Sequence, residues 1–456
     1  MNKQKIINTM VNISSGIEDF LHLAAFSLRI GPKQTVRLFQ EFPWLIKGLQ
    51  LHKLYKYTHR SLPYSREIVH FIFQYMIQVF ETYVKHPDRL IWFEELLTPE
   101  IPLAMGFTPF MPEAIGLFIP LVKNSIAEGY IDATENEGYP ADMCSFIKTS
   151  LGLVLKNELP APRLILTTNA PCDSAMAGYT PIEEKYGVPV FRLDQLYETN
   201  EKSVAYYARS LWKMIDFLEE TTGVKMDFNR LRDICEERNK QSDYIVEFRE
   251  LNRTRPAPAG AAGLILSILG HSLMPGSKLA TKFAKKFRDE SQKRFRNKIG
   301  STKTERIRYV MWGVPFETDA GIYEWMEETY GASMVAEMYS SRSYSFIDTS
   351  TPDSMLLGLA KDMMRGPMSK HTRGPARNYY EELIRLVKEY KADMVLLGAH
   401  IGCKSGSAIH GIVRDKLKEK GIPCLTIQFD VTDTRVVSPA DIRRQVSQFM
   451  EVIMKV

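Results

Sequence analysis

Apolar residues recur at every third or fourth position along roughly the first ninety residues of the chain. Three segments carry this spacing: FLHLAAFSLRI, TVRLFQEFPWLIKGLQLHKLYKY and REIVHFIFQYMIQVFETYVK. Such spacing places the apolar side chains on one face of a helix, where they can pack against a core. An N-terminal helical region over residues 1–88 is therefore predicted.

Short apolar runs alternate with helical segments over residues 89–200. RLILTTN, from Arg163, and VPVFRLD, from Val188, are predicted to be strands with a helical crossover between them. IPLAMGFTPF, from Ile101, is predicted to be another strand, followed by a turn rich in proline. Strand, helix and strand in this order indicate parallel pairing, with helices on the faces of the sheet.

Helical spacing returns over residues 201–304. One helix of this middle segment is predicted to end at Gly223, and Asp227 is placed to cap the next one. Strands and helices then alternate again over residues 305–456, where IRYVMWG, DMVLLGAH and PCLTIQFD read as strands. The predicted fold class is α/β, with two Rossmann/flavodoxin-like parallel-sheet domains, an N-terminal helical region and a helical middle segment.

The composition fits a globular protein of more than one domain. The chain has 456 residues, of which 45% are hydrophobic and 25% charged, and its formal net charge is +5. This mild charge gives no reason to expect nucleic acid as a partner. The first residues lack the apolar core of a signal peptide, and AAGLILSILGHSL, from Ala261, is too short and too interrupted to span a bilayer. A cytoplasmic protein with reduced cysteines and no membrane contact is predicted.

Three of the five cysteines occupy positions where ligands gather in α/β proteins. Cys172 and Cys403 follow predicted strands, and Cys144 stands near a helix start. Cys235 and Cys424 lie within a helix and a strand, where they are predicted to be buried. On position alone, packing is the favoured account of all five, because free cysteine is among the most buried residue types. The chain has no CxxC pair that would indicate a metal site by spacing.

Three stretches together resemble the 2-hydroxyacyl-CoA dehydratase and benzoyl-CoA reductase family. They are ENEGYPADMCSF, TTNAPCDSAMAGYTPIEEKYGVPVFRLDQLY and the closing segment that begins AHIGCKSGSAIHG. The similarity runs in order from about Pro87 to the carboxyl end. It is closest to the larger, substrate-binding type of subunit, as in 2-hydroxyglutaryl-CoA dehydratase.

The resemblance implies a [4Fe-4S] cluster between the two α/β domains. Carried over residue by residue, its ligands are Cys144, Cys172 and Cys403, with a group other than cysteine at the fourth iron. Glu113, in FTPFMPEA, resembles the glutamate of the family's Tyr-Pro-Glu-Asn segment, which faces the substrate. It is therefore the candidate catalytic residue, as an acid or base. Met111 and Ala114 stand where the family has Tyr and Asn, and a solvated turn carboxylate is the alternative interpretation.

The resemblance also implies a function. A subunit of this type eliminates water from a 2-hydroxyacyl-CoA through a ketyl radical, which makes the enzyme a lyase. Its partners would be a second dehydratase subunit in a heterodimer and an ATP-dependent iron–sulfur activator. The chain carries no GxxxxGK[ST] loop, so ATP hydrolysis is assigned to the activator. Two alternatives remain: a benzoyl-CoA reductase-type subunit, and a double-cubane-related electron-transfer protein without an acyl-CoA substrate.

Several residues next to the predicted ligands carry polar side chains. His400, Lys404 and His410 flank Cys403, and a surface or capping role is favoured for them over proton donation at the cluster. Ser145 and Asp173 are candidates for hydrogen bonds that tune its potential.

The basic stretch from Lys278 to Arg308 has apolar residues at helical spacing, namely Leu279, Phe283 and Phe287. An amphipathic helix with a solvated basic face is therefore predicted. A contribution to holding the phosphates of coenzyme A is the alternative.

Overall fold

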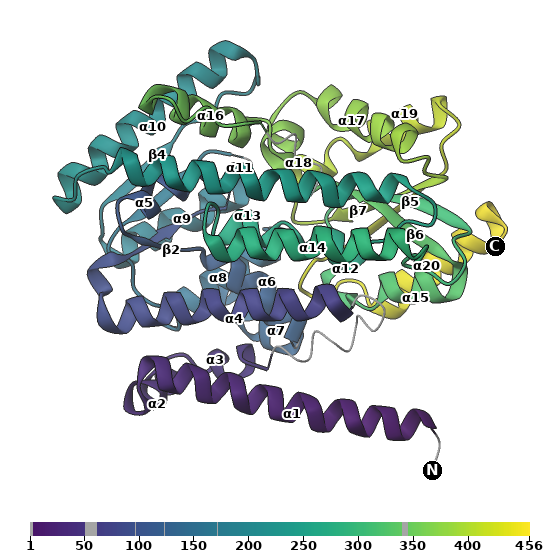
Figure 1. Ribbon diagram of the computed structural model, residues 1–456, viewed down its shortest axis with the longest axis horizontal. Coiled ribbons are helices and arrows are strands. Elements are labelled where there is room, and N and C mark those ends of the chain that lie inside the picture. Colours follow the sequence, from purple (N-terminus) through teal and green to yellow (C-terminus); the bar gives the residue numbers. More distant parts are fainter. Residues whose placement is uncertain (1–2, 51–61, 96, 123, 171, 340–344) are drawn as a thin grey trace.

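The chain folds around two four-stranded parallel sheets, which confirms the predicted fold class (Figure 1). The computed structural model describes residues 3–50, 62–95, 97–122, 124–170, 172–339 and 345–456. The first sheet has the order β2-β1-β3-β4, and its strands are β1 (Leu90–Phe93), β2 (Thr108–Phe110), β3 (Ile165–Thr168) and β4 (Val190–Leu193). The second has the order β6-β5-β7-β8, and its strands are β5 (Ile307–Gly313), β6 (Ala332–Glu337), β7 (Met394–His400) and β8 (Cys424–Phe429).

Both sheets reverse their strand order at an inner pair, β1 beside β3 and β5 beside β7. In open parallel sheets, ligands bind beyond the carboxyl ends of the strands at such a reversal. At the carboxyl end of the second sheet, Gly313 pairs with Gly398. A β-carbon on Gly398 would lie 2.0 Å from the carbonyl oxygen of Val314, so only glycine allows the two strands to approach this closely.

Helices cover both sheets. Those of the first domain are α5 (Glu100–Ala104), α6 (Pro112–Val122), α7 (Asn124–Asn136), α8 (Ser145–Leu155) and α9 (Asp173–Tyr186). Those of the second domain are α15 (Ile322–Tyr330), α16 (Pro352–Met364), α17 (Ala376–Glu389), α18 (Lys404–Ser407), α19 (His410–Glu419) and α20 (Pro439–Phe449).

The middle segment is helical, as predicted. Its helices are α10 (Glu201–Thr222), α11 (Phe228–Glu250), α12 (Ala261–Leu266), α13 (Leu269–Leu273) and α14 (Lys278–Arg296). The chain leaves α10 through Gly223 in the left-handed region (φ 73°), and the Asp227 side chain accepts two backbone hydrogen bonds at the start of α11. Helices α11 and α14 lie side by side (Figure 1). Phe283 and Phe287 of α14 are buried. The basic stretch therefore forms an amphipathic helix, as predicted.

A buried ionic network ties this middle segment to both α/β domains. Arg238 of α11 forms ion pairs with Glu100 of α5 and with Asp362 of α16. The Nε2 atom of His271 lies 3.3 Å from the Asp362 carboxylate. All four side chains are at most 3% exposed. Since a buried charge is costly without its partner, this network favours a single arrangement of the three segments.

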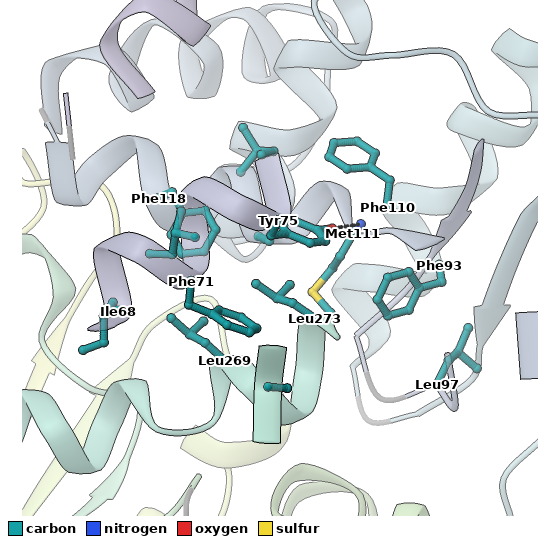
Figure 2. Close-up of a cluster of buried hydrophobic side chains, with 14 of the residues drawn as sticks. Ile68, Phe71, Tyr75, Phe93, Leu97, Phe110, Met111, Phe118, Leu269 and Leu273 are labelled. Carbon is teal, nitrogen blue, oxygen red and sulfur yellow. Dashed lines mark hydrogen bonds between the residues drawn. The ribbon is translucent and has the colours of Figure 1, made fainter. Parts of the chain in front are cut away.

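The N-terminal region consists of α1 (Lys3–Ile30), α2 (Pro32–Glu41), α3 (Trp44–Gly48) and α4 (Leu62–Lys85). Helix α4 is part of the main core (Figure 2). Its Tyr75 hydroxyl accepts a hydrogen bond from the backbone N–H of Met111 at 3.1 Å, which joins α4 to the loop after β2. Phe71 packs beside Leu269 of α13 (Figure 2). No helix in the described part of the chain is long and apolar enough to cross a membrane.

One sequence prediction in the first domain was wrong. The segment from Ile101 begins in helix α5, and only Thr108–Phe110 forms a strand. Pro102 lies in the first turn of α5, where a proline is tolerated because the backbone N–H there has no partner within the helix. Short apolar runs cannot be assigned to helix or strand by periodicity alone.

Candidate functional site

A cavity with about 1090 Å³ of empty space, part of it open to solvent, lies between the carboxyl ends of the two sheets. Glu95 follows β1 and Cys172 follows β3, and both line it from the first domain. Val314 follows β5 and His400 ends β7, and these line it from the second domain. The cavity therefore occupies the strand-order reversal of both sheets, where parallel α/β folds bind ligands.

Cys144, Cys172 and Cys403 all line this cavity. Each is the N-cap residue of a helix, of α8, α9 and α18 respectively. Cys144 is buried, and the other two are partly exposed. The structure thus brings together the three cysteines that the sequence singled out.

The loops that carry these cysteines are in contact. Gly402 directly precedes Cys403, and a β-carbon added to it would lie 2.6 Å from the Cα atom of Cys144. The Sγ atom of Cys403 lies 3.1 Å from the position of a β-carbon on Gly406. Glycine at position 402 lets the two domains approach each other at the cysteines, and glycine at position 406 leaves room for the Cys403 thiol.

Burial raises the pKa of all three thiols. It raises the pKa of Cys144 well above the ordinary value, and the charges of Cys172 and Cys403 add to this effect. The pKa of Cys172 is raised to about 12, and the pKa of Cys403 is also raised. The protein alone therefore does little to stabilise three thiolates here, whereas bound iron would supply the compensating positive charge.

Two kinds of metal site differ in how their protein ligands are arranged. In the described residues, no three His, Cys, Asp or Glu side chains converge on a single ion, so a mononuclear site is not formed. The cysteines of an iron–sulfur cluster bind different irons and surround it from several sides. Three cysteines on three loops around one cavity fit that arrangement and would leave one iron of a four-iron cluster without a protein thiolate.

The two remaining cysteines lie away from this cavity. Cys235 is fully buried on α11, as predicted. Cys424 is only partly buried, which differs from the prediction, because β8 is the edge strand of its sheet. Its sulfur lies 3.9 Å from the Thr426 hydroxyl oxygen.

Two histidines line the cavity, and the prediction of a surface role for them was wrong. His400 is 1% exposed, and its Nδ1 accepts the backbone N–H of Val431 at 3.3 Å. The ring proton therefore lies on Nε2, which has no hydrogen-bond partner among the described residues. Burial lowers the pKa of His400, although Asp430 opposes this, and burial lowers the pKa of His410 to about 4. Both rings are thus neutral near pH 7.

Other polar residues lie close to the cysteines. The hydroxyl of Ser174 accepts a hydrogen bond from the backbone N–H of Cys144 at 3.3 Å. Ser145 is buried, and its hydroxyl has no partner in the described part of the structure. Asp173 lines the cavity, and Lys404 at its rim is ion-paired with Asp142. Ser145 and Asp173 remain candidates for hydrogen bonds to a bound group.

Glu113 lies in the first turn of α6 and is buried, so it is not a solvated turn carboxylate. Glu113 is not among the residues that line the cavity, although Leu117, one helical turn further along α6, does line it. Burial raises the pKa of Glu113 to about 8, and the nearby Tyr179 hydroxyl offsets only part of this effect. A proton held by this carboxyl near neutral pH suits an acid–base role, which stays a prediction.

Sequence reasoning missed two carboxylates, Glu95 and Glu317, that line the cavity directly. Glu317 borders two cavities and so keeps part of its surface accessible. The surrounding protein still desolvates it and raises its pKa well above the ordinary value, with a smaller contribution from Glu95. A signal was present in the sequence, because each residue closely follows a buried strand, β1 or β5.

Comparison with known proteins supports the same relationship. The chain is 24% identical over 347 residues to a benzoyl-CoA reductase subunit of Thauera aromatica, a match that covers 71% of this chain and 80% of that one. It is 21% identical over 399 residues to the alpha subunit of lactoyl-CoA dehydratase of Anaerotignum propionicum, covering 80% and 91% of the two chains. It is 20% identical over 376 residues to the (R)-2-hydroxyisocaproyl-CoA dehydratase alpha subunit of Clostridioides difficile, covering 79% and 89%.

The family model described as 2-hydroxyglutaryl-CoA dehydratase, D-component, matches residues 97–453, which include all three cysteines of the cavity. The resemblance drawn from the sequence is therefore confirmed. The N-terminal helices α1 to α4 lie outside the matched residues. This chain belongs to the 2-hydroxyglutaryl-CoA dehydratase D-component family.

Proposed function

We propose that this chain is the cluster-binding, substrate-binding subunit of a 2-hydroxyacyl-CoA dehydratase, a lyase that converts a 2-hydroxyacyl-CoA into the 2-enoyl-CoA. The observation that carries the proposal is the single cavity lined by Cys144, Cys172 and Cys403 at the strand-order reversals of two parallel sheets. Two relatives named as 2-hydroxyacyl-CoA dehydratase subunits match about four-fifths of the chain.

In this proposal the three cysteines hold a [4Fe-4S] cluster. When bound, the cluster would supply one-electron chemistry at the thioester carbonyl. This is needed because acid–base catalysis alone cannot remove a β-proton of such low acidity. The protein contributes a cavity between the two domains, which limits the access of bulk water to the reacting thioester. His400 lines this cavity and has no hydrogen-bond partner for its Nε2–H among the described residues, so it is the proposed donor to an oxygen of the substrate. Glu113 does not line the cavity, and its raised pKa supports it as the proposed acid–base group.

The proposed enzyme includes further proteins. The relatives are named as subunits, which supports a second dehydratase subunit in a heterodimer. An ATP-dependent iron–sulfur activator would supply the electron, since the chain itself has no phosphate-binding GxxxxGK[ST] loop. We place this enzyme in the reducing cytoplasm, in keeping with its five free cysteines.

Cysteine substitutions test the cluster. Anaerobically purified protein should contain roughly four irons per chain and absorb broadly in the visible range. Cys144→Ser, Cys172→Ser and Cys403→Ser should each lose iron, because iron–sulfur clusters select thiolate over hydroxyl ligands. Cys235→Ser and Cys424→Ser are the matched controls and should keep it. Full iron content in any of the first three variants would remove that cysteine from the ligand set.

Turnover tests the reaction. With its second subunit, the activator, ATP and a strong reductant, the chain should form the 2-enoyl-CoA through many turnovers per activation, because elimination returns the electron. The match to a benzoyl-CoA reductase subunit favours a second candidate function, reduction of an aromatic thioester. Consumption of reductant in proportion to product would support that candidate. An intact cluster in a chain that binds no acyl-CoA would instead support an electron-transfer protein.

A further inference from the structure

A second cavity adjoins the cavity of the cysteines. It has about 610 Å³ of empty space, part of it open to solvent. The large side chains that line it are almost all apolar: Ile68, Leu121, Ile265, Leu266, Phe316 and Tyr323. The two cavities share Ile265, Leu266, Pro315 and Glu317 as lining residues. The apolar cavity therefore meets the cavity of the cysteines at these four residues.

The charges around the two cavities disfavour a ligand that carries a carboxylate into the apolar cavity. Glu317, at their junction, is the one charged residue among the described residues that line the apolar cavity. In the described lining of the first cavity, Lys404 is the only lysine or arginine, and it is ion-paired with Asp142 at the rim. The desolvation that raises the pKa of Glu317 would act equally on a carboxylate of a ligand placed beside it.

Part of the apolar cavity lies outside the residues that match the family model. Ser65 and Ile68 of α4 form one side of it, and they precede residue 97, where the match to the family begins. Ala262, Ile265 and Leu266 of α12 form another side. In Figure 2, Ile68 lies on the part of α4 that runs beside α13.

We infer that the acyl chain of the substrate occupies this second cavity and ends in an apolar group, so that the enzyme acts on aliphatic 2-hydroxyacyl thioesters rather than on dicarboxylic ones. The inference rests on the proposed function. It specifies the substrate class of that site, since a terminal carboxylate would enter an apolar chamber beside Glu317 without a cation to pair with it among the described lining residues.

Binding measurements test the inference without turnover. The anaerobically purified, cluster-containing full chain would be titrated by calorimetry with lactoyl-CoA, 2-hydroxyisocaproyl-CoA and 2-hydroxyglutaryl-CoA. The branched aliphatic thioester should bind most tightly. The glutaryl thioester should bind at least about tenfold more weakly, as expected when a site leaves a buried polar group unpaired.

Two variants examine the cavity itself. Ala262→Leu should fill part of it and weaken binding of 2-hydroxyisocaproyl-CoA about tenfold, while binding of the shorter lactoyl-CoA stays unchanged. The matched control is Ala440→Leu, at an exposed position in the first turn of α20. Leu266→Lys places a cation in the cavity and should strengthen binding of 2-hydroxyglutaryl-CoA relative to the wild type.

The possible outcomes separate the inference from the proposed function. Tightest binding of 2-hydroxyglutaryl-CoA by the wild type, or equal binding of all three thioesters with no effect of Ala262→Leu, would overturn the inference and leave the dehydratase proposal standing. If none of the three thioesters binds, both are overturned.

Discussion

Gly402 offers a sharp test of how the two domains meet at the proposed cluster. A β-carbon at this position would lie 2.6 Å from the Cα atom and 2.9 Å from the backbone nitrogen of Cys144, and 2.8 Å from Nε2 of His400. Two of these three atoms belong to the backbone, which cannot rotate away. Ordinary van der Waals contact begins at 3.4 Å, so the loop of Cys403 must move by about 0.8 Å relative to Cys144.

A displacement of this size is large for a metal site. Functional constellations must be held within about 0.5 Å of their working geometry. Gly402→Ala should therefore lower the iron content of anaerobically purified protein well below that of the wild type, although every cysteine is kept. The overpacking should also cost about 1–3 kcal/mol of stability, visible as a lower thermal unfolding midpoint.

The chain offers a matched control for this substitution. Gly411 lies in the first turn of α19, and a β-carbon there would meet nothing within 4 Å. Gly411→Ala should retain full iron content and wild-type stability or slightly more, because alanine favours the helix. Iron would be measured by colorimetric assay and by visible absorbance. Full iron content in Gly402→Ala would refute the reasoning, whatever the unfolding midpoint.

Two further predictions concern buried charges. Burial raises the pKa of Glu113 to about 8, so the folded state holds a proton that the unfolded state releases, and stability falls as the pH rises from about 4.5 to about 8. Glu113→Gln should then unfold at a higher temperature than the wild type near pH 9 and at the same temperature near pH 4.5; a pH-independent difference would contradict the shifted pKa. Asp362→Asn breaks the ion pair with Arg238 and should cost about 3–5 kcal/mol in urea unfolding. Asp88→Asn, at an exposed ion pair with Arg89, is the control, and a similar loss there would argue against the role of burial.

The three cysteines of the cavity could be found from the sequence because their positions depend on local patterns. Cys172 and Cys403 each follow a strand with a clear apolar run, and Cys144 precedes a helix. Parallel strands end at the same edge of a sheet, so residues that follow them converge without any knowledge of the tertiary structure. The same rule applies to Glu95 and Glu317, which also follow strands. They were missed because charged residues after strands are common, and nothing local distinguishes a buried one.

The apolar cavity could not be predicted from the sequence. Its walls come from Ile68 of α4 and from Ile265 and Leu266 of α12, nearly two hundred residues apart. Each of these residues fits the apolar face of its own helix, which periodicity identifies as core. Whether two such faces close on each other or leave a space depends on their packing angles and side-chain volumes, which a pattern of apolar positions does not contain.

The arrangement of the proposed ligands links cluster binding to the association of the two domains. Cys144 and Cys172 belong to the first α/β domain, and Cys403 belongs to the second. A cluster held by all three would therefore bridge the domains, at the place where Gly402 lets their backbones touch. The Arg238 network joins the same two domains through α5 and α16. Because these ion pairs need no metal, they can hold the domains close together before a cluster binds, which lowers the entropic cost of bringing the third cysteine to it.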